Sequence, residues 1–310
     1  MYNYIEYNRC WWFIGSKIAE CLIHQGFSIT GIDNLKTGCI ENVPEGVNFI
    51  NGDCANPEIF QKKYLHGVNF HTIIHFAGQS SGEISFDDPI QDLNDNCIST
   101  LNLLELARKI SCKRFIYASS MSVYGEAQVE TVDENHATKP LSMYAVGKLA
   151  SENYLKIYEQ YGISSVSLRL FNVYGPGQNM SNLRQGMVSI YLAQAFEKKS
   201  IVIKGSADRF RDFIYIDDVT QIVNHFVKND FVGSEIYNVC TGIKTKVSTL
   251  IDVIKSEFIK DSFLVEFKDS TPGDQFGIVG NNNKLIEKLG DIDFVGIKEG
   301  IQKFIKSIKT

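Results

Sequence analysis

The sequence lacks the features that would assign it to several large classes of protein. It has no uninterrupted apolar run long enough to cross a membrane, so we expect no membrane partner. It has no excess of basic residues, because 31 lysines and arginines stand against 36 aspartates and glutamates and the formal net charge is −5. We therefore expect no binding to nucleic acid. Its first residues, MYNYIEYNR, lack the basic start and the apolar core of a secretory signal.

The cysteines form no disulfide or metal-binding pattern. Seven of them are scattered at positions 10, 21, 39, 54, 97, 112 and 240, without a CxxC pair. An odd number of scattered thiols is typical of the reducing cytoplasm rather than of a disulfide framework or a zinc site. We expect a cytoplasmic globular protein without a bound metal. A chain of 310 residues, 44% of them hydrophobic, is long enough for a substantial core and two lobes.

Short β-branched or aromatic runs alternate with amphipathic stretches in the first half of the chain. The runs predict strands at residues 28–33, 47–50, 71–76, 114–118 and 165–170. Such alternation predicts an α/β fold, with a doubly wound parallel sheet (a Rossmann domain) over residues 1–172. After Gly175-Pro176-Gly177 the pattern loosens, which predicts a smaller, mixed α/β substrate-binding lobe over residues 173–310, partly interleaved with the first domain. Ligands of such sheets bind at the carboxyl ends of the strands.

Two carboxylates follow predicted strands. Asp33 ends the second strand, 18 residues after Gly15. A carboxylate at this place can accept hydrogen bonds from both ribose hydroxyls of an adenosine and would repel a 2′-phosphate, which favours NAD over NADP. Asp53, in Asn51-Gly52-Asp53, stands where a carboxylate could meet the adenine edge. The alternative for Asp33 is an ordinary exposed turn before Asn34.

A serine run and a Tyr-x-x-x-Lys pair carry the strongest chemical signal. Ser119-Ser120-Met121-Ser122 follows a predicted strand, and Tyr144 and Lys148 are four residues apart in a helical run that Ser142 could cap. A free phenol titrates near about 10, and a fixed ammonium group lowers that value because it favours the phenolate. A serine at the strand end could bind the same substrate hydroxyl. The alternative is a surface Tyr/Lys pair on a solvated helix.

The motifs together resemble those of the extended short-chain dehydrogenase/reductase family. The resemblance is to its NAD-dependent nucleotide-sugar epimerases and dehydratases, in particular the UDP-glucose 4-epimerase-like proteins, and it covers nearly the whole chain. Residues 33–38 resemble the ribose turn, residues 75–78 the strand end beside the nicotinamide, and Asn96 the structural asparagine. Residues 169–176 and 211–219 match the segments whose Asn and Arg bind the nucleotide sugar.

The resemblance implies a cofactor, a substrate, a set of site residues and a homodimer. The catalytic residues would be Ser120, Tyr144 as the base, and Lys148, which also binds the nicotinamide ribose. NAD would be bound by Phe13, Ile14, Gly15, Asp33, Asn34, Asp53, Cys54, Phe76, Ala77, Gly78, Asn96, Ser119, Tyr144, Lys148 and Phe171. A nucleotide-diphosphate sugar would be bound by Ser122, Asn172 and Arg211. Two copies would pair through the helices of segment 90–110 and of the segment after Tyr144.

Within this family, the resemblance favours C4 epimerisation of a UDP-hexose through a transient 4-keto sugar. Dehydratases and decarboxylases place an acidic residue just after the serine or threonine, whereas Ser120 is followed by Met121 and Ser122. Thr271 stands where the family commonly has a second phosphate-binding arginine, and Ile278 decides little about an N-acetyl group. The alternatives are a 4,6-dehydratase and a catalytically silent member of the family.

The silent alternative comes from the stretch YNRCWWFIGS, residues 7–16. The family pattern places glycines at positions 9, 12 and 15, and only Gly15 is present, because Arg9 and Trp12 occupy the other two. Glycines allow the backbone to approach a pyrophosphate closely, and bulky side chains would fill that space. Residues 2–7 also suit a buried strand poorly, since Asn3 and Glu6 interrupt it.

The genetic code offers one cause for these anomalies. Tryptophan has the single codon TGG, so Trp11-Trp12-Phe13 reads TGG TGG TTY, and the same bases read one position later give two glycine codons. In that frame Arg9 also becomes glycine if its codon ends in GG, and the early tyrosines become isoleucine or threonine. One missing base would explain every departure, and the alternative is genuine divergence. The chain as written would then bind NAD weakly.

Overall fold

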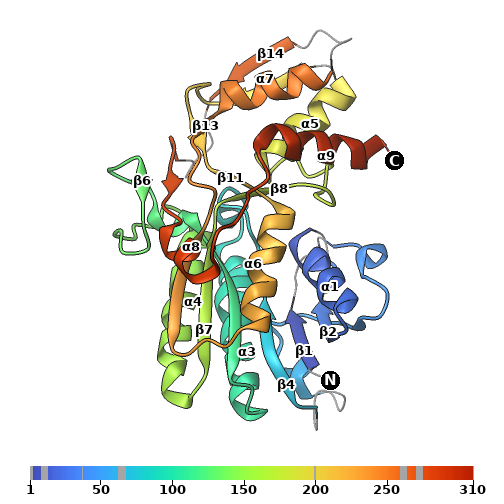
Figure 1. Cartoon of the computed structure of the whole chain (residues 1–310), viewed down its shortest axis with the longest axis vertical. Coiled ribbons are helices and arrows are strands. Elements are labelled where there is room, and N and C mark those ends of the chain that lie inside the picture. The colour runs from blue at the N-terminus through green and yellow to red at the C-terminus, as the bar shows by residue number, and fades with distance from the viewer. Residues whose placement is uncertain are drawn as a thin grey trace.

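The protein consists of a large α/β part and a smaller lobe above it in the view of Figure 1. The computed structural model describes residues 3–7 (backbone only), 13–36, 38–61, 68–198, 200–258, 264–269 and 275–309. The amino end of the chain lies at the foot of the large part, and the smaller lobe covers the end of the sheet at which the strands finish (Figure 1).

A seven-stranded sheet forms the centre of the large part. Every neighbouring pair of strands is parallel, which confirms the predicted doubly wound sheet. From edge to edge its strands are β3 (Asn48–Asn51), β2 (Ser28–Asp33), β1 (Asn3–Tyr7), β4 (Phe70–His75), β5 (Arg114–Ser120), β7 (Ser164–Leu170) and β12 (Ser234–Val239).

The first strand forms in spite of its polar residues. The segment Asn3–Tyr7 pairs with β2 on one side and with β4 on the other. The ladder is built from backbone groups, so an unfavourable side-chain pattern does not by itself prevent it. The prediction that residues 2–7 form a strand poorly is therefore wrong for the backbone of residues 3–7. The positions of Arg9 and Trp12 lie outside the described residues.

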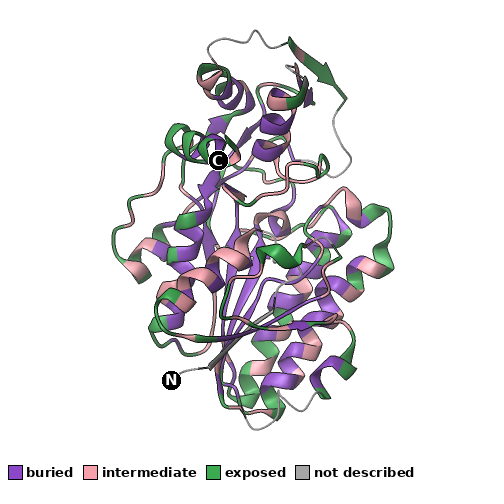
Figure 2. Cartoon of the chain, turned by 90° about the vertical axis from the view of Figure 1, so that its right-hand side faces the viewer, coloured by how far each residue is buried: buried purple, intermediate pink, exposed green. Residues whose placement is uncertain are grey.

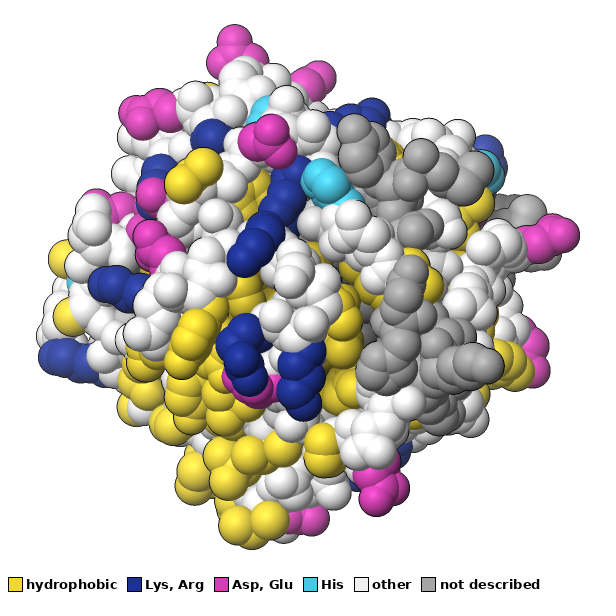
Figure 3. All heavy atoms as spheres, turned by 90° about the horizontal axis from the view of Figure 1, so that it is seen from below, with side chains coloured by type: hydrophobic (Ala, Val, Ile, Leu, Met, Phe, Trp, Pro, Cys, Tyr) yellow, Lys and Arg dark blue, Asp and Glu magenta, His cyan; other side chains and the backbone are white. Residues whose placement is uncertain are grey.

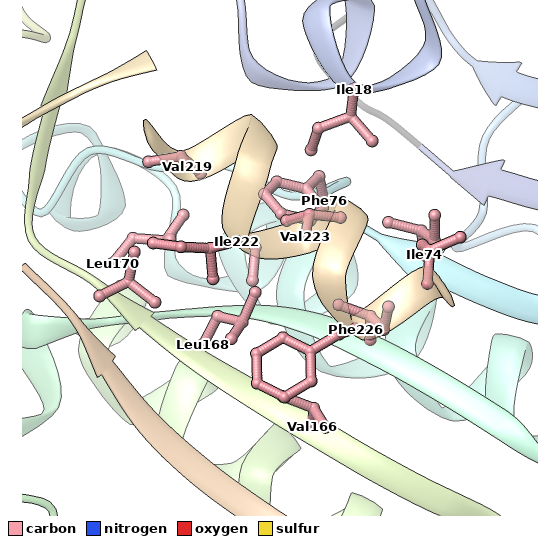
Figure 4. Packing of buried hydrophobic residues seen from close by; sticks show 14 of the residues in the cluster. Ile18, Ile74, Phe76, Val166, Leu168, Leu170, Val219, Ile222, Val223 and Phe226 are labelled. Atoms are coloured by element: carbon pink, nitrogen blue, oxygen red, sulfur yellow. The ribbon is translucent and has the colours of Figure 1, made fainter. Parts of the chain in front are cut away.

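Helices cover both faces of the sheet, because alternate residues of each strand point to opposite sides. On one face, α1 (Ile14–His24) packs against α6 (Ile216–Lys228). Figure 4 shows Ile18 of α1 and Val219, Ile222, Val223 and Phe226 of α6 gathered over side chains of β4 and β7. On the other face, α3 (Ser99–Lys109) and α4 (Met143–Tyr158) enclose a second core that includes Phe115 and Tyr117 of β5.

A π turn interrupts the helical segment that precedes α3. The short helix α2 (Pro89–Leu93) continues into five residues of π-helix, Asn94–Ile98, and then into α3. Such turns inside helices are frequent at functional sites. Here the turn buries Asp95, Asn96 and Cys97 together.

The smaller lobe has its own core. It contains α5 (Met187–Lys198), α7 (Val247–Glu257) and α9 (Ile297–Lys309), which pack with β9 (Ser200–Lys204) around shared apolar side chains. Parallel pairs join β9 to β14 (Leu264–Lys268) and β8 (Asn172–Tyr174) to β11 (Phe213–Tyr215). Short pairs join β10 (Phe210–Arg211) to β13 (Thr245–Lys246) and β6 (Thr131–Val132) to β15 (Val279–Gly280).

The two parts exchange segments of chain. Strand β12 and helix α6 come after residue 173 in the sequence and yet belong to the large part, where α8 (Asn283–Leu289) also packs against β12. Figure 2 shows a continuous buried centre running through the large part, with exposed residues on the outer sides of the helices. Segments from beyond residue 173 therefore contribute both a strand and helices to the large part.

The described residues at the amino ends of the strands present side chains of both charges on the surface (Figure 3). Figure 3 views this face, on which basic, acidic and hydrophobic side chains all occur. Within the described ranges, none of the helices combines the length and the apolar character that a bilayer crossing requires.

Candidate active site

A cavity of about 600 Å³ lies between the sheet and the smaller lobe. Its floor is made by residues at the carboxyl ends of β4, β5 and β7, including Phe76, Ser120 and Leu170. Its walls come from α4 and the segment after β4 on one side, and from the smaller lobe, with Met187 and Arg211, on the other. This is the place where parallel α/β sheets bind ligands, and where the sequence placed the site.

Helix α4 carries Tyr144 and Lys148 into the cavity. Ser142 caps the helix, since its Oγ accepts a hydrogen bond from the Ala145 backbone N–H at 3.2 Å. Both side chains line the cavity, with only 9% of Tyr144 and 4% of Lys148 exposed. The Lys148 Nζ atom lies 5.7 Å from the centre of the Tyr144 ring. The structure therefore places the pair inside the site and not on a solvated helix face.

The Lys148 ammonium group has two further contacts behind the cavity. Its Nζ donates a hydrogen bond of 2.9 Å to the Ala118 backbone carbonyl and lies 4.9 Å from the centre of the Tyr117 ring. Both residues belong to β5, so the strand fixes the position of the ammonium group. Tyr117 carried no signal in the sequence, because it reads as one apolar residue of a buried strand.

Three serines at the end of β5 have different surroundings. The Ser122 Oγ donates to the Ser120 Oγ at 3.0 Å, and both residues line the cavity. The Ser119 Oγ instead donates to Glu152 at 2.5 Å. Glu152 also holds Arg169 in a buried ion pair, so the Ser119 hydroxyl is engaged in a structural network. Glu152 follows Lys148 by four residues, and this helical spacing could have revealed it.

The carboxylates at the ends of β2 and β3 surround a second, much smaller cavity. It is lined by Asp33, Asn34, Asp53, Cys54 and Ala77, among others. Asp33 is 1% exposed and its Oδ1 accepts the Leu35 backbone N–H at 2.6 Å, while Asn34 donates to Asp53 Oδ2 at 2.9 Å. A buried carboxylate at the end of the second strand fits the ribose of an adenosine. The carboxylate here and the Tyr144–Lys148 pair in the large cavity are therefore groups that would suit the two ribose units of a dinucleotide.

Asn96 holds the backbone that follows β4. Its Nδ2 donates to the Gln79 carbonyl at 3.1 Å and to Asp92 Oδ1 at 3.2 Å. Gly78 has a φ of +140°, and a side chain there would collide with the Asn96 amide oxygen. The π turn thus brings Asn96 against the loop of the nicotinamide-side strand end, which supports a structural role for this asparagine.

Arg211 and Asn172 stand at the other end of the cavity. The Arg211 guanidinium donates to the carbonyls of Phe210 at 2.8 Å, Gln275 at 2.8 Å and Phe276 at 3.1 Å. Burial, with a smaller contribution from Arg209, lowers the pKa of Arg211 to about 10, so it stays charged at neutral pH. Asn172 donates to the Asp212 carbonyl at 2.9 Å. A guanidinium fixed at a cavity wall suits a phosphate group.

A strap of chain, residues 178–185, closes the cavity on the side of the smaller lobe. Gly177 and Gly186, with φ of +91° and +85°, stand at its two ends. Arg184 donates to Asp87 at 2.7 Å and to Glu83 at 3.4 Å, and its hydrogen bond lowers the pKa of Asp87. No local pattern in the sequence predicts this strap, since the partners of Arg184 are about a hundred residues away.

The structure brings the sequence-predicted residues to the two cavities. The large one is lined by Phe13, Ile14, Phe76, Gly78, Ser119, Ser120, Ser122, Tyr144, Lys148, Phe171, Asn172 and Arg211, and the small one by Asp33, Asn34, Asp53, Cys54 and Ala77. Gly15 is buried in the first turn of α1, beside Ile14. Ile278 is buried in a cluster with Tyr124 and Phe171, and Thr271 lies outside the described residues. The wall residues Gln79, Gln178 and Arg184 were not foreseen.

Comparisons with known proteins give a consistent result. A protein-family model described as "NAD dependent epimerase/dehydratase family" matches residues 13–240. A Methanocaldococcus jannaschii protein, provisionally named a UDP-glucose 4-epimerase, is 34% identical over 302 residues, which cover 96% of each chain. The Thermotoga maritima UDP-glucose 4-epimerase, solved with UDP-glucose, is 29% identical with a TM-score of 0.93, over 99% of this chain and 98% of that chain. The Thermus thermophilus UDP-glucose 4-epimerase, solved with NAD, is 30% identical with a TM-score of 0.88, over 99% of each.

Proposed function

Because this chain belongs to the NAD-dependent epimerase/dehydratase family, for which NAD is the cofactor, we propose that it inverts C4 of a nucleotide-diphosphate sugar. The substrate we propose is a UDP-hexose, and the reaction passes through a transient 4-keto sugar. The observation that carries this proposal is the buried Tyr144–Lys148 pair, which lines one cavity together with Ser120 and Ser122.

Tyr144 acts as the base in this proposal. Its phenolate takes the proton of the sugar 4-hydroxyl and later returns a proton to the same oxygen, so it ends the cycle unchanged. Ser120 and Ser122 hydrogen-bond the reacting hydroxyl, and the Lys148 ammonium favours the phenolate by its charge. NAD, when bound, supplies the hydride acceptor and donor at C4.

The chain offers matching groups to the cofactor. Asp33 would accept hydrogen bonds from the adenosine ribose, and the edge of the adenine would lie toward Asp53 and Cys54. Lys148 would bind the nicotinamide ribose close to Tyr144. Phe76 and Gly78, which follow β4, line the same cavity. Ser119 would contribute its backbone, because its hydroxyl is bound to Glu152.

The nucleotide diphosphate would bind beneath the smaller lobe. Arg211 offers a charged donor to a phosphate, and Asn172 lies on the same wall. The UDP-glucose bound by the Thermotoga maritima relative supports uridine as the base. The strap residue Arg184 borders the same cavity, and its ion pairs with Glu83 and Asp87 join the two parts of the protein across it.

Epimerisation fits this cavity better than dehydration does. A 4,6-dehydratase needs an acid and a base for chemistry beyond C4, and the two residues that follow Ser120 are Met121 and Ser122. A silent protein is the rival from another class, and it is favoured by Arg9 and Trp12 at two positions where the family has glycine. We also propose a homodimer in the cytoplasm. The scattered free cysteines are consistent with a reducing compartment.

Incubation of the purified chain with UDP-glucose or UDP-galactose, with NAD added, tests the proposal. The expected result is an approach to the same mixture of the two hexoses from either side, with no net consumption of NAD. A 4-keto-6-deoxy product would show a dehydratase instead. No turnover by either the chain as written or a form with glycines at positions 9 and 12 would support the silent alternative.

A further inference from the structure

We infer that Tyr117 is a positioning residue for the reaction, because the face of its buried ring holds the Lys148 ammonium group beside the Tyr144 phenol. The Lys148 Nζ lies 4.9 Å from the centre of the Tyr117 ring and 5.7 Å from that of Tyr144, so both rings are within reach of the same ammonium group. This inference rests on the proposed role of Tyr144 as the base.

An ammonium group at this depth needs compensation for the water that it loses. Lys148 is 4% exposed, and its ammonium group donates a hydrogen bond to the Ala118 carbonyl. The electron-rich face of an aromatic ring attracts a cation, and the attraction is strongest where both partners are desolvated. The Tyr117 ring is fully buried, so this site meets that condition.

The strand explains why these groups meet. Tyr117 and Ala118 are consecutive in β5, where the Tyr117 side chain points into the core beneath α3 and α4. The Ala118 carbonyl at the strand end takes the hydrogen bond from the same ammonium group. Burial holds the pKa of Tyr117 well above its usual range, so its ring acts as a neutral π face and not as a phenolate.

The other titratable and charged groups around Lys148 come from four elements. His75 on β4 is neutral, because burial and then Lys148 hold its pKa well below the usual range. Burial raises the pKa of Cys97 in the π turn, so it remains a thiol. Asp92 on α2 faces α4 at Gly147, and Glu152, one turn along α4, is bound to Arg169. All of these groups remain in place when only Tyr117 is changed.

The test titrates Tyr144 directly in the purified chain without cofactor. NMR of isotope-labelled tyrosine rings follows the phenol as the pH rises, and the Tyr144→Phe variant assigns its signal. In Tyr117→Leu, the ammonium group loses its ring contact and either releases its proton or moves away. Either change removes positive charge beside the phenolate, so the titration midpoint of Tyr144 rises by about one pH unit. Tyr117→Phe keeps the ring face and leaves the midpoint unchanged.

A series of fluorinated side chains at position 117 tests the same inference if the Tyr117→Leu variant does not fold. Phenylalanines with increasing numbers of ring fluorines at position 117 keep the shape of the ring but lower the electron density of its face. The titration midpoint of Tyr144 should therefore rise with each added fluorine. A wild-type midpoint in folded Tyr117→Leu, or no trend along the fluorinated series, would overturn the inference. Since no turnover is measured, this outcome is separate from a failure of the epimerase proposal, which would appear as absent UDP-hexose conversion.

Discussion

The carboxylate of Glu152 and the guanidinium of Arg169 form a bidentate ion pair behind the carboxyl end of β5. The Arg169 Nε and Nη2 atoms lie 2.9 Å and 2.8 Å from the two carboxylate oxygens, and the side chains are 3% and 4% exposed. The same carboxylate accepts the Ser119 hydroxyl at 2.5 Å. The pair therefore ties α4, which carries Tyr144 and Lys148, to β7 and to the end of β5.

Removal of one partner of this pair should destabilise the fold strongly. Glu152→Gln leaves the Arg169 charge buried without its counter-ion, and we expect a loss of about 3–5 kcal/mol in the free energy of unfolding. The matched control is Glu20→Gln, which breaks an exposed pair with Lys17 and should cost less than about 1 kcal/mol. Urea unfolding followed by circular dichroism measures both. Equal losses would contradict the central position given to the pair.

Replacement of the proposed base should separate catalysis from binding. We expect Tyr144→Phe to reduce epimerase turnover by about 10²–10⁴-fold, because the 4-hydroxyl loses its proton acceptor, while affinity for the nucleotide sugar is kept. Tyr158→Phe on the same helix is the control, since its hydroxyl contacts Glu105 away from the cavity. Near wild-type turnover by Tyr144→Phe would refute the mechanism.

Asp33 should set the preference for NAD over NADP. Its buried carboxylate repels a 2′-phosphate and offers charged hydrogen bonds to a free ribose, so we expect NAD to bind at least about tenfold more tightly. Asp33→Ser should narrow the ratio of the two affinities, whereas Asp208→Ser, which removes an exposed carboxylate paired with Lys246, should not. Calorimetric titration of both cofactors measures the ratio. Equal affinities in the unchanged chain would count against this assignment.

The glycine-loop hypothesis predicts weak binding of NAD by the chain as written. Arg9→Gly combined with Trp12→Gly should lower the dissociation constant at least about tenfold, because the backbone can then approach the pyrophosphate at a helix N-terminus. Arg9→Lys with Trp12→Phe keeps both side chains bulky and serves as the control. Matching dissociation constants would show a working variant of the loop, and the DNA sequence across codons 1–16 would decide between a missing base and divergence.

The proposed homodimer should depend on an apolar face of α2 and α4. Ile90, Leu93 and Val146 are 69%, 48% and 51% exposed, and the two helices pack against each other. We expect Val146→Asp to convert a dimer into a monomer, because the same surface of both copies takes part in an isologous contact and each copy would bury one new charge there. Ile243→Asp, at an equally exposed isoleucine of the smaller lobe, is the control. A wild-type chain that sediments as a monomer at micromolar concentration would disprove the dimer.

The sequence could predict those parts of the site that depend on local patterns. The strands 28–33 and 165–170 appear almost unchanged as β2 and β7, because buried parallel strands are short apolar runs with clear ends. The sequence could predict the helix that carries Tyr144 and Lys148, because an N-cap such as Ser142 and a four-residue spacing are properties of a single helix. The strand ends then indicated the location of the cavity.

Contacts between residues far apart in the sequence could not be predicted in this way. The ion pairs of Arg184 with Glu83 and Asp87 join segments that no local pattern connects. Leu104 belongs to the segment 90–110 through which the dimer was expected to form, and it is fully buried in the core on its own sheet. Helical spacing shows that a helix has an apolar face, and only the packed structure shows what covers that face.

The late arrival of β12 has a consequence for the synthesis of the chain. Strand β7 acquires its outer neighbour only when residues 234–239 have been made, and α1 acquires its cover only with α6 at residues 216–228. A nascent chain that stops between residues 172 and 215 therefore presents an unpaired strand edge and an uncovered apolar helix. Such fragments should be bound by chaperones or aggregate, and co-expression of the missing segment should be needed to make them soluble.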